Sequence, residues 1–416
     1  MKDNTHLNSS PKVSIWNRNF ICLIIAQAFF GLSQSSVNIL IARYATEALG
    51  VSSVFMGTLA GLGFGVALAM RPVAGPLQMK LDKRKLLIGV YFLGVVANVG
   101  YALFNFTGAF VAFRCLQGVQ YAFTGSLTMT LVADSLPKER MFTGVAVYGL
   151  GATVMQAVGP NIGTLLRDLG PKLQDGADGL MLGYKFAFFF AAAILVLSVV
   201  PILMTSYKEE VKTEIASTEA WYENIISIHA LPMTLVLFLS AMSYSVYNNY
   251  LDAFANEVGI AKIGVFFSVS AAVMICTRPA SGRIVERFGI KKVIPLGMII
   301  LIGSFATVSA SRVLPMALVG AFLAAFGYGM VSPSLQAACV QTEVPHRRAV
   351  SSNTIFVGMD LGNFVGPFLS GLVASASNYS MVILTAIVPV GVAIVLFFAF
   401  VPGYNRRLDA IAAMEE

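Results

Sequence analysis

The chain reads Arg71-Pro72-Val73-Ala74-Gly75-Pro76-Leu77-Gln78-Met79-Lys80-Leu81-Asp82-Lys83-Arg84-Lys85 where an apolar run ends in a basic cluster. The second half contains a closely similar stretch, Arg278-Pro279-Ala280-Ser281-Gly282-Arg283-Ile284-Val285-Glu286-Arg287-Phe288-Gly289-Ile290-Lys291-Lys292. The two Arg-Pro-x-x-Gly sequences start 207 positions apart, at Arg71 and Arg278, in a chain of 416 residues. A repeat at about half the chain length indicates a duplicated unit.

Two further repeats have nearly the same spacing. Gly159-Pro160 recurs as Gly366-Pro367, 207 positions later, and Pro137-x-x-Arg140 recurs as Pro345-x-x-Arg348, 208 positions later. Three repeats at almost one spacing are hard to obtain by chance. The sequence therefore predicts two related halves.

The composition indicates a membrane protein. Hydrophobic residues make up 57% and charged residues 12% of the sequence, and the mean hydropathy is +0.76. A soluble domain is about 25% charged. Apolar runs of about 20 residues, which recur along this chain, cross the ~30 Å hydrocarbon layer as helices. The sequence therefore predicts an all-α integral membrane protein, with the lipid bilayer as its partner.

Neither a metal site nor a cofactor is indicated. Each of the four cysteines lies in an apolar run, which is typical of packing residues without disulfides, and the three histidines are far apart. The Gly61-x-Gly63-x-Gly65 run lies inside an apolar span rather than after a strand. No Gly-x-x-x-x-Gly-Lys-Ser/Thr sequence occurs, so an ATP-driven pump is not indicated.

We expect twelve spans in two pseudo-symmetric bundles of six. The predicted spans are 19–42, 53–77, 86–106, 108–132, 141–166, 184–206, 229–252, 260–282, 291–310, 314–339, 349–374 and 379–402. The bundles are then 19–206 and 229–402, with tails at 1–18 and 403–416 and a linker at 207–228. An even number of spans places both tails on one side of the membrane.

Charge predicts that this side is cytoplasmic. Lys and Arg favour cytoplasmic loops, and most of the 28 Lys and Arg residues lie in the tails or in loops on the same side. The net charge of +7 is therefore mainly a topology signal and does not indicate nucleic acid. Short loops and a polar N-terminal segment favour the inner (cytoplasmic) membrane of a bacterium.

Twelve spans in two halves, with a basic loop led by glycine after the second and eighth spans, resemble the major facilitator superfamily. The loop of that family reads Gly-x-x-x-Asp-x-x-Gly-x-Arg/Lys-x-Arg/Lys or close to it. The second copy fits, with Gly282, Glu286, Arg287, Gly289, Lys291 and Lys292. The resemblance implies secondary transport by two bundles that rock around a central site, in a protein that works as a monomer.

The first copy of the loop departs from the family pattern. Gly75 and Arg84 fit, whereas Met79 stands at the acidic position and Asp82 at the second glycine. In the family, the acid pairs with helix ends and cations and holds the cytoplasmic face shut. The resemblance implies that the latch of the first half is lost or shifted to Asp82. The gating residues that it implies are Arg71, Gly75, Asp82, Arg84, Arg278, Gly282, Glu286, Arg287 and Lys291.

Two other spans also resemble the family. Arg114-Cys115-Leu116-Gln117-Gly118 matches a motif of the form Arg-x-x-Gln-Gly in the fourth span. Gly159-Pro160-Asn161-Ile162-Gly163 keeps the Gly-Pro-x-x-Gly core of a motif seen in exporters, although the upstream glycines of that motif are missing.

Asp360 is the candidate for proton coupling. It lies about eleven residues into its span, near the membrane middle at 1.5 Å per residue. An acidic side chain at that depth costs roughly 2.5–3.5 kcal/mol, and a carboxyl group away from water can exchange a proton near neutral pH. Three other readings stay open: pairing with a cationic substrate, a structural ion pair with an arginine, or a polar packing contact.

Polar side chains at helical spacing give candidates for substrate binding. Arg114 and Tyr121 share a stripe in the fourth span, where Arg114 is expected to hold an anionic substrate, to tune an acid or to form a buried pair. A second stripe lies in the first span and an aromatic set in the seventh. The remaining candidates are Gln27, Gln34 and Asn38, then Gln156, Tyr244 and Tyr247, and finally Tyr328 and Gln336. The alternative for each is hydrogen bonding between helices or a place in the interfacial aromatic belt.

These features favour proton-coupled efflux of a small organic or drug-like molecule by antiport. The coupling ion is expected to be the proton. The alternative is uptake of a sugar, organic acid or other metabolite by proton symport. A membrane-embedded enzyme or a receptor is a remote alternative, because neither a catalytic grouping nor an appended domain occurs in the sequence.

Overall fold

The computed structural model describes residues 14–50, 53–206 and 225–415. This part of the chain is helical, without a strand. The first half contains α1 (Arg18–Arg43), η1 (Tyr44–Ala48), α2 (Ser53–Lys80), α3 (Lys83–Leu103), α4 (Thr107–Ser135), η2 (Lys138–Arg140), α5 (Met141–Leu173) and α6 (Gly176–Leu203). The second half contains α7 (Leu231–Val258), α8 (Val265–Phe288), α9 (Ile290–Ala310), α10 (Leu314–Gln341), η4 (Pro345–Arg347), α11 (Arg348–Ala376), α12 (Tyr379–Thr385) and α13 (Ile387–Glu415).

The helices confirm the expected all-α membrane architecture. In the described residues, nine helical segments are long and apolar enough to cross a membrane, and α12 and α13 count together as one of them. Long helices α2, α4 and α7 complete the twelve. Helix α13 continues to Glu415, so the predicted tail 403–416 is helical as far as that residue. Most of the predicted linker and of the N-terminal tail lies outside the described residues.

The helix bounds repeat with a constant spacing. Helices α3 and α9 start and end 207 positions apart, and so do the short helices η2 and η4. Helices α5 and α11 also start 207 positions apart, at Met141 and Arg348. The structural counterpart of Arg140 is therefore Arg347. The two Pro-x-x-Arg sequences, which are 208 positions apart, are thus offset by one residue relative to the helices.

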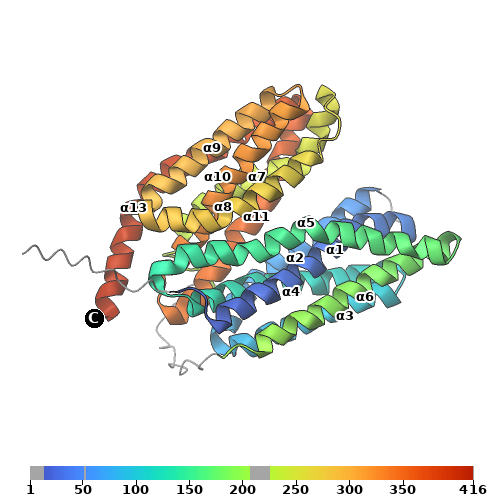
Figure 1. The fold of residues 1–416 in the computed structure, drawn as a ribbon, viewed down its shortest axis with the longest axis horizontal. Coiled ribbons are helices and arrows are strands. Elements are labelled where there is room, and N and C mark those ends of the chain that lie inside the picture. The colour runs from blue at the N-terminus through green and yellow to red at the C-terminus, as the bar shows by residue number, and fades with distance from the viewer. Residues whose placement is uncertain (1–13, 51–52, 207–224, 416) are drawn as a thin grey trace, which may run out of the picture.

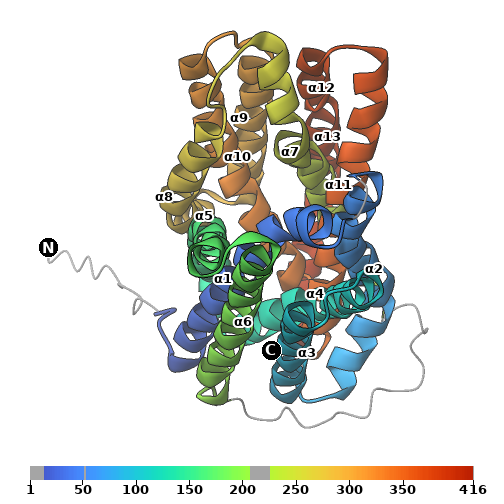
Figure 2. The same cartoon turned by 90° about the vertical axis from the view of Figure 1, so that its right-hand side faces the viewer.

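The two halves form two bundles that meet at one end. In Figure 1 the bundle of α1–α6 and the bundle of α7–α13 converge where α13 ends and diverge in the other direction. Figure 2 looks along the molecule and shows the two bundles one above the other. We call the converging end the termini face. It contains the α2–α3, α4–α5, α8–α9 and α10–α11 connections and the end of α13.

The repeated Gly-Pro sequence brings helices close together inside each bundle. A Cβ atom at Gly159 of α5 would overlap Ser35 of α1, and one at Gly366 of α11 would overlap Met242 of α7. Ser35 and Met242 are themselves 207 positions apart. Small residues allow such close backbone approach between membrane helices. The motif thus fixes α5 and α11 against α1 and α7 in both halves.

Candidate functional site

A buried ion pair joins the two bundles. The Nη2 and Nε atoms of Arg71 in α2 lie 2.9 and 3.2 Å from Oδ2 of Asp360 in α11. The side chains of Arg71 and Asp360 are only 3% and 16% exposed. Arg71 precedes Lys80, the end of α2, by nine residues. At 1.5 Å per residue this is roughly 14 Å from the termini face, so the pair lies near the membrane middle.

Other groups complete the surroundings of Arg71. Its Nη1 donates to the Ala122 carbonyl oxygen of α4 at 2.7 Å, and its guanidinium lies 5.0 Å from the centre of the Phe356 ring. Asn353 Nδ2 donates to the Arg71 carbonyl oxygen at 2.8 Å. We call Arg71, Asp360, Phe356 and Asn353 the Arg71 site. Residues from both bundles therefore meet at one cation.

Four of the predicted site residues of the first bundle, Gln34, Asn38, Arg114 and Tyr121, lie in one network. The Gln34 side-chain oxygen accepts from Gln117 Nε2 at 2.8 Å and from the Tyr121 hydroxyl at 2.7 Å. Tyr121 also donates to Asn38 Oδ1 at 3.1 Å, and Arg114 Nη1 donates to Gln117 Oε1 at 2.5 Å. Arg114 and Gln34 are buried, whereas Asn38 is exposed. The network thus leads from a buried arginine to the surface of α1.

Sequence reasoning missed one member of this network. Gln34 Nε2 donates to Gln120 Oε1 at 3.2 Å, and Gln120 is fully buried. Gln120 lies three residues after Gln117 on α4, a spacing that places two side chains on one helix face. That spacing was the signal that could have found it. Gln27 lies apart from these residues and accepts from the Tyr148 hydroxyl at 2.9 Å.

The predicted aromatic residues of the second bundle divide into two groups. Tyr244 of α7 and Tyr328 of α10 stack with ring centroids 4.1 Å apart. Tyr247 is 1% exposed, shares a hydrogen bond of 2.8 Å with Ser304 and stacks on Phe305. The structure thus places Tyr247 in the interior of the bundle, packed against Phe305 and Phe266.

Two glutamine candidates lie apart from these clusters. Gln336 Nε2 donates to Ser332 Oγ within α10 at 3.0 Å. Gln156 is exposed on α5. Exposed polar groups in the middle of a membrane helix normally face water or other protein rather than lipid.

The second copy of the repeated loop contacts the first bundle at the termini face. Glu286 Oε2 lies 2.9 Å from Arg140 Nη1, and Glu286 Oε1 accepts from the Thr143 backbone nitrogen at 2.9 Å. Thr143 lies in the first turn of α5, where a free backbone N–H group favours an anion. A Cβ atom at Gly282 would overlap the Thr143 backbone. We call Glu286, Arg140 and Thr143 the Glu286 latch.

Within the described residues, the next basic residues of the motif, Arg287 and Lys291, form no ion pair with the first bundle. Arg287 lies over the Phe288 ring at 5.3 Å, and Lys291 is exposed. The acid and the glycine of the motif therefore make the contact between the bundles at this place.

The first copy of the loop stays within its own bundle. Asp82 caps α3 by accepting from the Lys85 backbone nitrogen at 2.9 Å, and Arg84 donates to the Ile202 and Leu203 carbonyl oxygens of α6. Gly75 is buried inside α2. The Asp82 side chain, one of the two outcomes implied for the latch of the first half, therefore makes no bundle-to-bundle contact in the described structure.

A different acid bridges the bundles on this side. Asp134, near the end of α4, has Oδ1 3.2 Å from Arg348 Nη1 and Oδ2 2.8 Å from Lys83 Nζ. Arg348 is the first residue of α11. We call Asp134, Arg348 and Lys83 the Asp134 latch. Met79 leaves the acidic position of the motif empty, and Asp134 supplies the carboxylate from the neighbouring helix.

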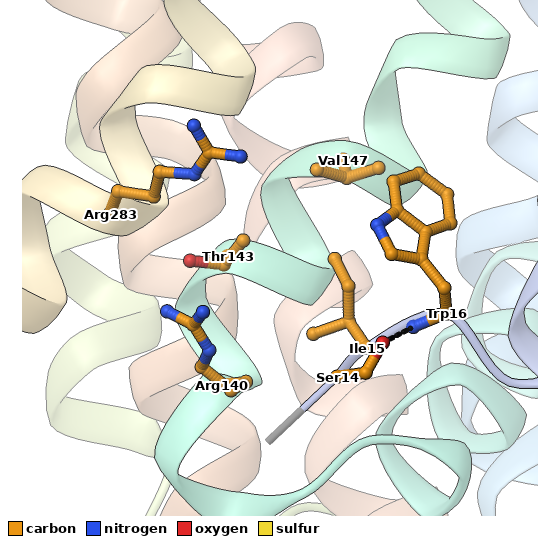
Figure 3. Close-up of a pocket in the computed structure, with 7 residues that line it drawn as sticks. All are labelled: Ser14, Ile15, Trp16, Arg140, Thr143, Val147 and Arg283. Atoms are coloured by element: carbon orange, nitrogen blue, oxygen red, sulfur yellow. Dashed lines mark hydrogen bonds between the residues drawn. The ribbon is translucent and has the colours of Figure 1, made fainter. Parts of the chain in front are cut away.

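A pocket opens at the termini face beside the Glu286 latch. Figure 3 shows its lining, with Arg140 and Arg283 on one side and Trp16 on the other. The lining residues are Ser14, Ile15, Trp16, Arg140, Thr143, Val147 and Arg283. None of the predicted substrate residues is among them. The pocket therefore belongs to the converging end of the molecule rather than to the buried polar groups.

The sequence matches the model of one protein family over almost its whole length. The model of the Major Facilitator Superfamily matches residues 23–231 and 233–416. The chain therefore belongs to this family, which is a family of membrane transporters rather than of enzymes.

Relatives and a solved structure agree with this assignment. The staphylopine export protein of Staphylococcus aureus is 21% identical over 320 residues, which cover 74% of this chain and 72% of the relative. The multidrug resistance protein MdtG of Proteus mirabilis is 24% identical over 404 residues, covering 90% and 92%. The structure of the transporter FucP in its outward conformation has a TM-score of 0.74 at 14% identity, covering 93% of this chain and 98% of that one. That likeness shows a shared fold.

Proposed function

We propose that the protein exports a small organic molecule in exchange for protons, by alternating access. The observation that carries the proposal is the ion pair of Arg71 and Asp360, which is buried and joins the two bundles. Two relatives are named for export and for drug resistance, and this favours efflux over the alternative, proton-coupled uptake.

The ion pair gives protonation a mechanical effect. While Asp360 is charged, it holds α11 to α2 through Arg71. A proton on Asp360 removes its negative charge, so the attraction to Arg71 is lost and the bundles are free to rock. Transport then requires a protonated state that faces one side and a deprotonated state that faces the other.

The proposed topology places the termini face in the cytoplasm of a bacterial cell, with the protein as a monomer in the inner membrane. Both latches lie on the termini face, so this conformation is closed to the cytoplasm and opens outward. In the proposed cycle, an external proton reaches Asp360 in this conformation as substrate leaves. We propose that Gln34, Asn38 and Tyr121 line the substrate path in the first bundle.

The test uses proteoliposomes that hold an imposed proton gradient. Cationic, neutral and anionic organic compounds are added, and the internal pH is followed for the wild type and for Asp360→Asn. We expect at least one compound to discharge the gradient with the wild type and not with the variant. Asp252→Asn, which removes an exposed carboxylate on α7, is the matched control and should behave like the wild type.

Two results would contradict the proposal. Equal discharge with Asp360→Asn would show that Asp360 is structural. Discharge that occurs only when compound and proton move in the same direction would replace antiport by symport.

A further inference from the structure

Arg278 is a cation inside α8 that pairs with no carboxylate in the described part of the chain. It precedes Phe288, the end of α8, by ten residues, which is roughly 15 Å from the termini face. Within the described residues, no carboxylate pairs with Arg278, and its Nε is buried without a hydrogen-bond partner. An isolated charge is costly away from water. The site therefore lacks a component that would balance this charge.

The sequence repeat shows which component is missing. Arg278 is the counterpart of Arg71, 207 positions later, and the counterpart of Asp360 is Thr153 of α5. The Thr153 hydroxyl donates to the Gly149 carbonyl oxygen at 3.0 Å, and a hydroxyl group carries no charge at neutral pH. The two halves thus place an arginine at the same position, and one half supplies its acid while the other does not.

The repeat also shows a difference in side-chain size beside the two arginines. The Arg71 guanidinium lies over the Phe356 ring, and the counterpart of Phe356 is Gly149. A Cβ atom at Gly149 would overlap Nη1 of Arg278, so the Arg278 guanidinium lies over Gly149 as the Arg71 guanidinium lies over Phe356. The Arg278 guanidinium thus takes up space at Gly149 that a side chain fills at Phe356 in the other half.

A flat aromatic surface lies beside the unpaired cation. Tyr244 of α7 and Tyr328 of α10 stack with ring centroids 4.1 Å apart, and their hydroxyl groups lie within electrostatic reach of Arg278. Tyrosine rings offer apolar faces and polar edges. The surroundings of Arg278 therefore combine one positive charge, a glycine packed against its guanidinium and aromatic surface, contributed by both bundles.

We propose that Arg278 binds the carboxylate of the transported molecule, whose planar apolar part packs beside Tyr244 and Tyr328. An arginine fork matches a carboxylate in geometry and binds it with two hydrogen bonds. The substrate class is thus an organic acid with an aromatic or similarly flat body. This inference rests on the proposed function, since it names the substrate of that transport.

The test measures ligand binding to the purified full-length protein by thermal unfolding. The probes are matched pairs, benzoate with benzamide and 2-naphthoate with 2-naphthamide, titrated against the wild type, Arg278→Gln and Thr153→Asp. Thr153→Asp keeps the arginine and installs the acid that the other half has. Thr164→Asp is the control, because Thr164 is also on α5 and bonds to its own helix backbone in the same way.

We expect the wild type to bind each carboxylate at least about tenfold more tightly than its amide, the discrimination expected when a charged hydrogen-bonding partner is lost. Arg278→Gln and Thr153→Asp should abolish this preference, and Thr164→Asp should retain it. Without ligand, Thr153→Asp should also raise the unfolding temperature, because Arg278 gains a partner.

Equal binding of carboxylate and amide by the wild type would overturn the inference, and so would carboxylate binding to Thr153→Asp at wild-type affinity. The proton-gradient assay separates this failure from that of the proposed function. Carboxylate binding without coupled flux would leave the Arg278 assignment standing and remove antiport. Coupled flux of neutral or cationic compounds alone would leave antiport standing and remove the Arg278 assignment.

Discussion

Arg71 and Asp360 illustrate what one residue can and cannot reveal. A carboxylate inside an apolar span marks a site that needs an explanation, and the sequence predicted Asp360 on that ground. Its partner lies 289 positions away in the chain, and no local pattern links the two residues. Arg71 was assigned to the gating loop because it begins the repeated motif, whereas its side chain lies deep between the bundles.

The pair predicts a specific pattern of stabilities. Arg71→Gln should destabilise the protein by about 3–5 kcal/mol, because it leaves a buried carboxylate without its counter-ion. The double variant Arg71→Gln with Asp360→Asn should recover most of this loss, since neither charge then remains unpaired. Thermal unfolding in detergent measures both. Losses in the single variants that simply add in the double variant would show that the pair is not coupled.

At the scale of elements, the apolar runs of the sequence predicted the helices but not the contacts between them. The twelve expected segments are present as long helices, because a run of about 20 mainly apolar residues crosses a membrane as a helix. The bridge between α4 and α11 was missed. Asp134 had no place in the family motif, and its role depends on how the end of α4 lies beside the start of α11.

The Glu286 latch predicts the effect of removing one charge. Glu286→Gln should weaken the contact of α8 with α5, because it loses the ion pair with Arg140 and weakens the cap on the first turn of α5. Spin labels at the exposed positions Leu81 and Phe288 should move apart in double electron–electron resonance. Glu139→Gln, an exposed acid in η2, is the control. An unchanged distance in Glu286→Gln would mean that the latch does not hold this conformation.

The Asp134 latch makes a separate prediction on the other side of the interface. Asp134→Asn should release both Arg348 and Lys83, so the same pair of spin labels should again separate. Because the two latches close one interface, the variant with both substitutions should populate the open form more than either single variant. A double variant that stays closed would place the holding force elsewhere, with the Arg71 site as the next element to test.

At the scale of the whole molecule, the proposed orientation predicts which side each end occupies. A green fluorescent protein fused after residue 416 should fluoresce in bacterial cells, because it folds in the cytoplasm. Alkaline phosphatase fused after Asp175, between α5 and α6, should be active, because it needs the oxidising exterior. The opposite pattern of activities would show that the termini face lies outside the cell. The present conformation would then open to the cytoplasm.

The two-fold plan of the molecule was readable from the sequence, because a duplication repeats spacing as well as residue types. The difference between the halves became visible only when the helices were placed, since Thr153 and Gly149 carry no signal of their own. Their meaning comes from their counterparts Asp360 and Phe356, which surround the matching arginine.

That difference depends on both halves being one polypeptide. In a dimer of two identical half-length chains, every substitution appears twice, so both arginines would have an acid or both would lack one. A fused chain lets the two copies diverge. One arginine can then have an acid within the protein while the other is left for the carboxylate of a bound molecule, a difference that exact two-fold symmetry forbids.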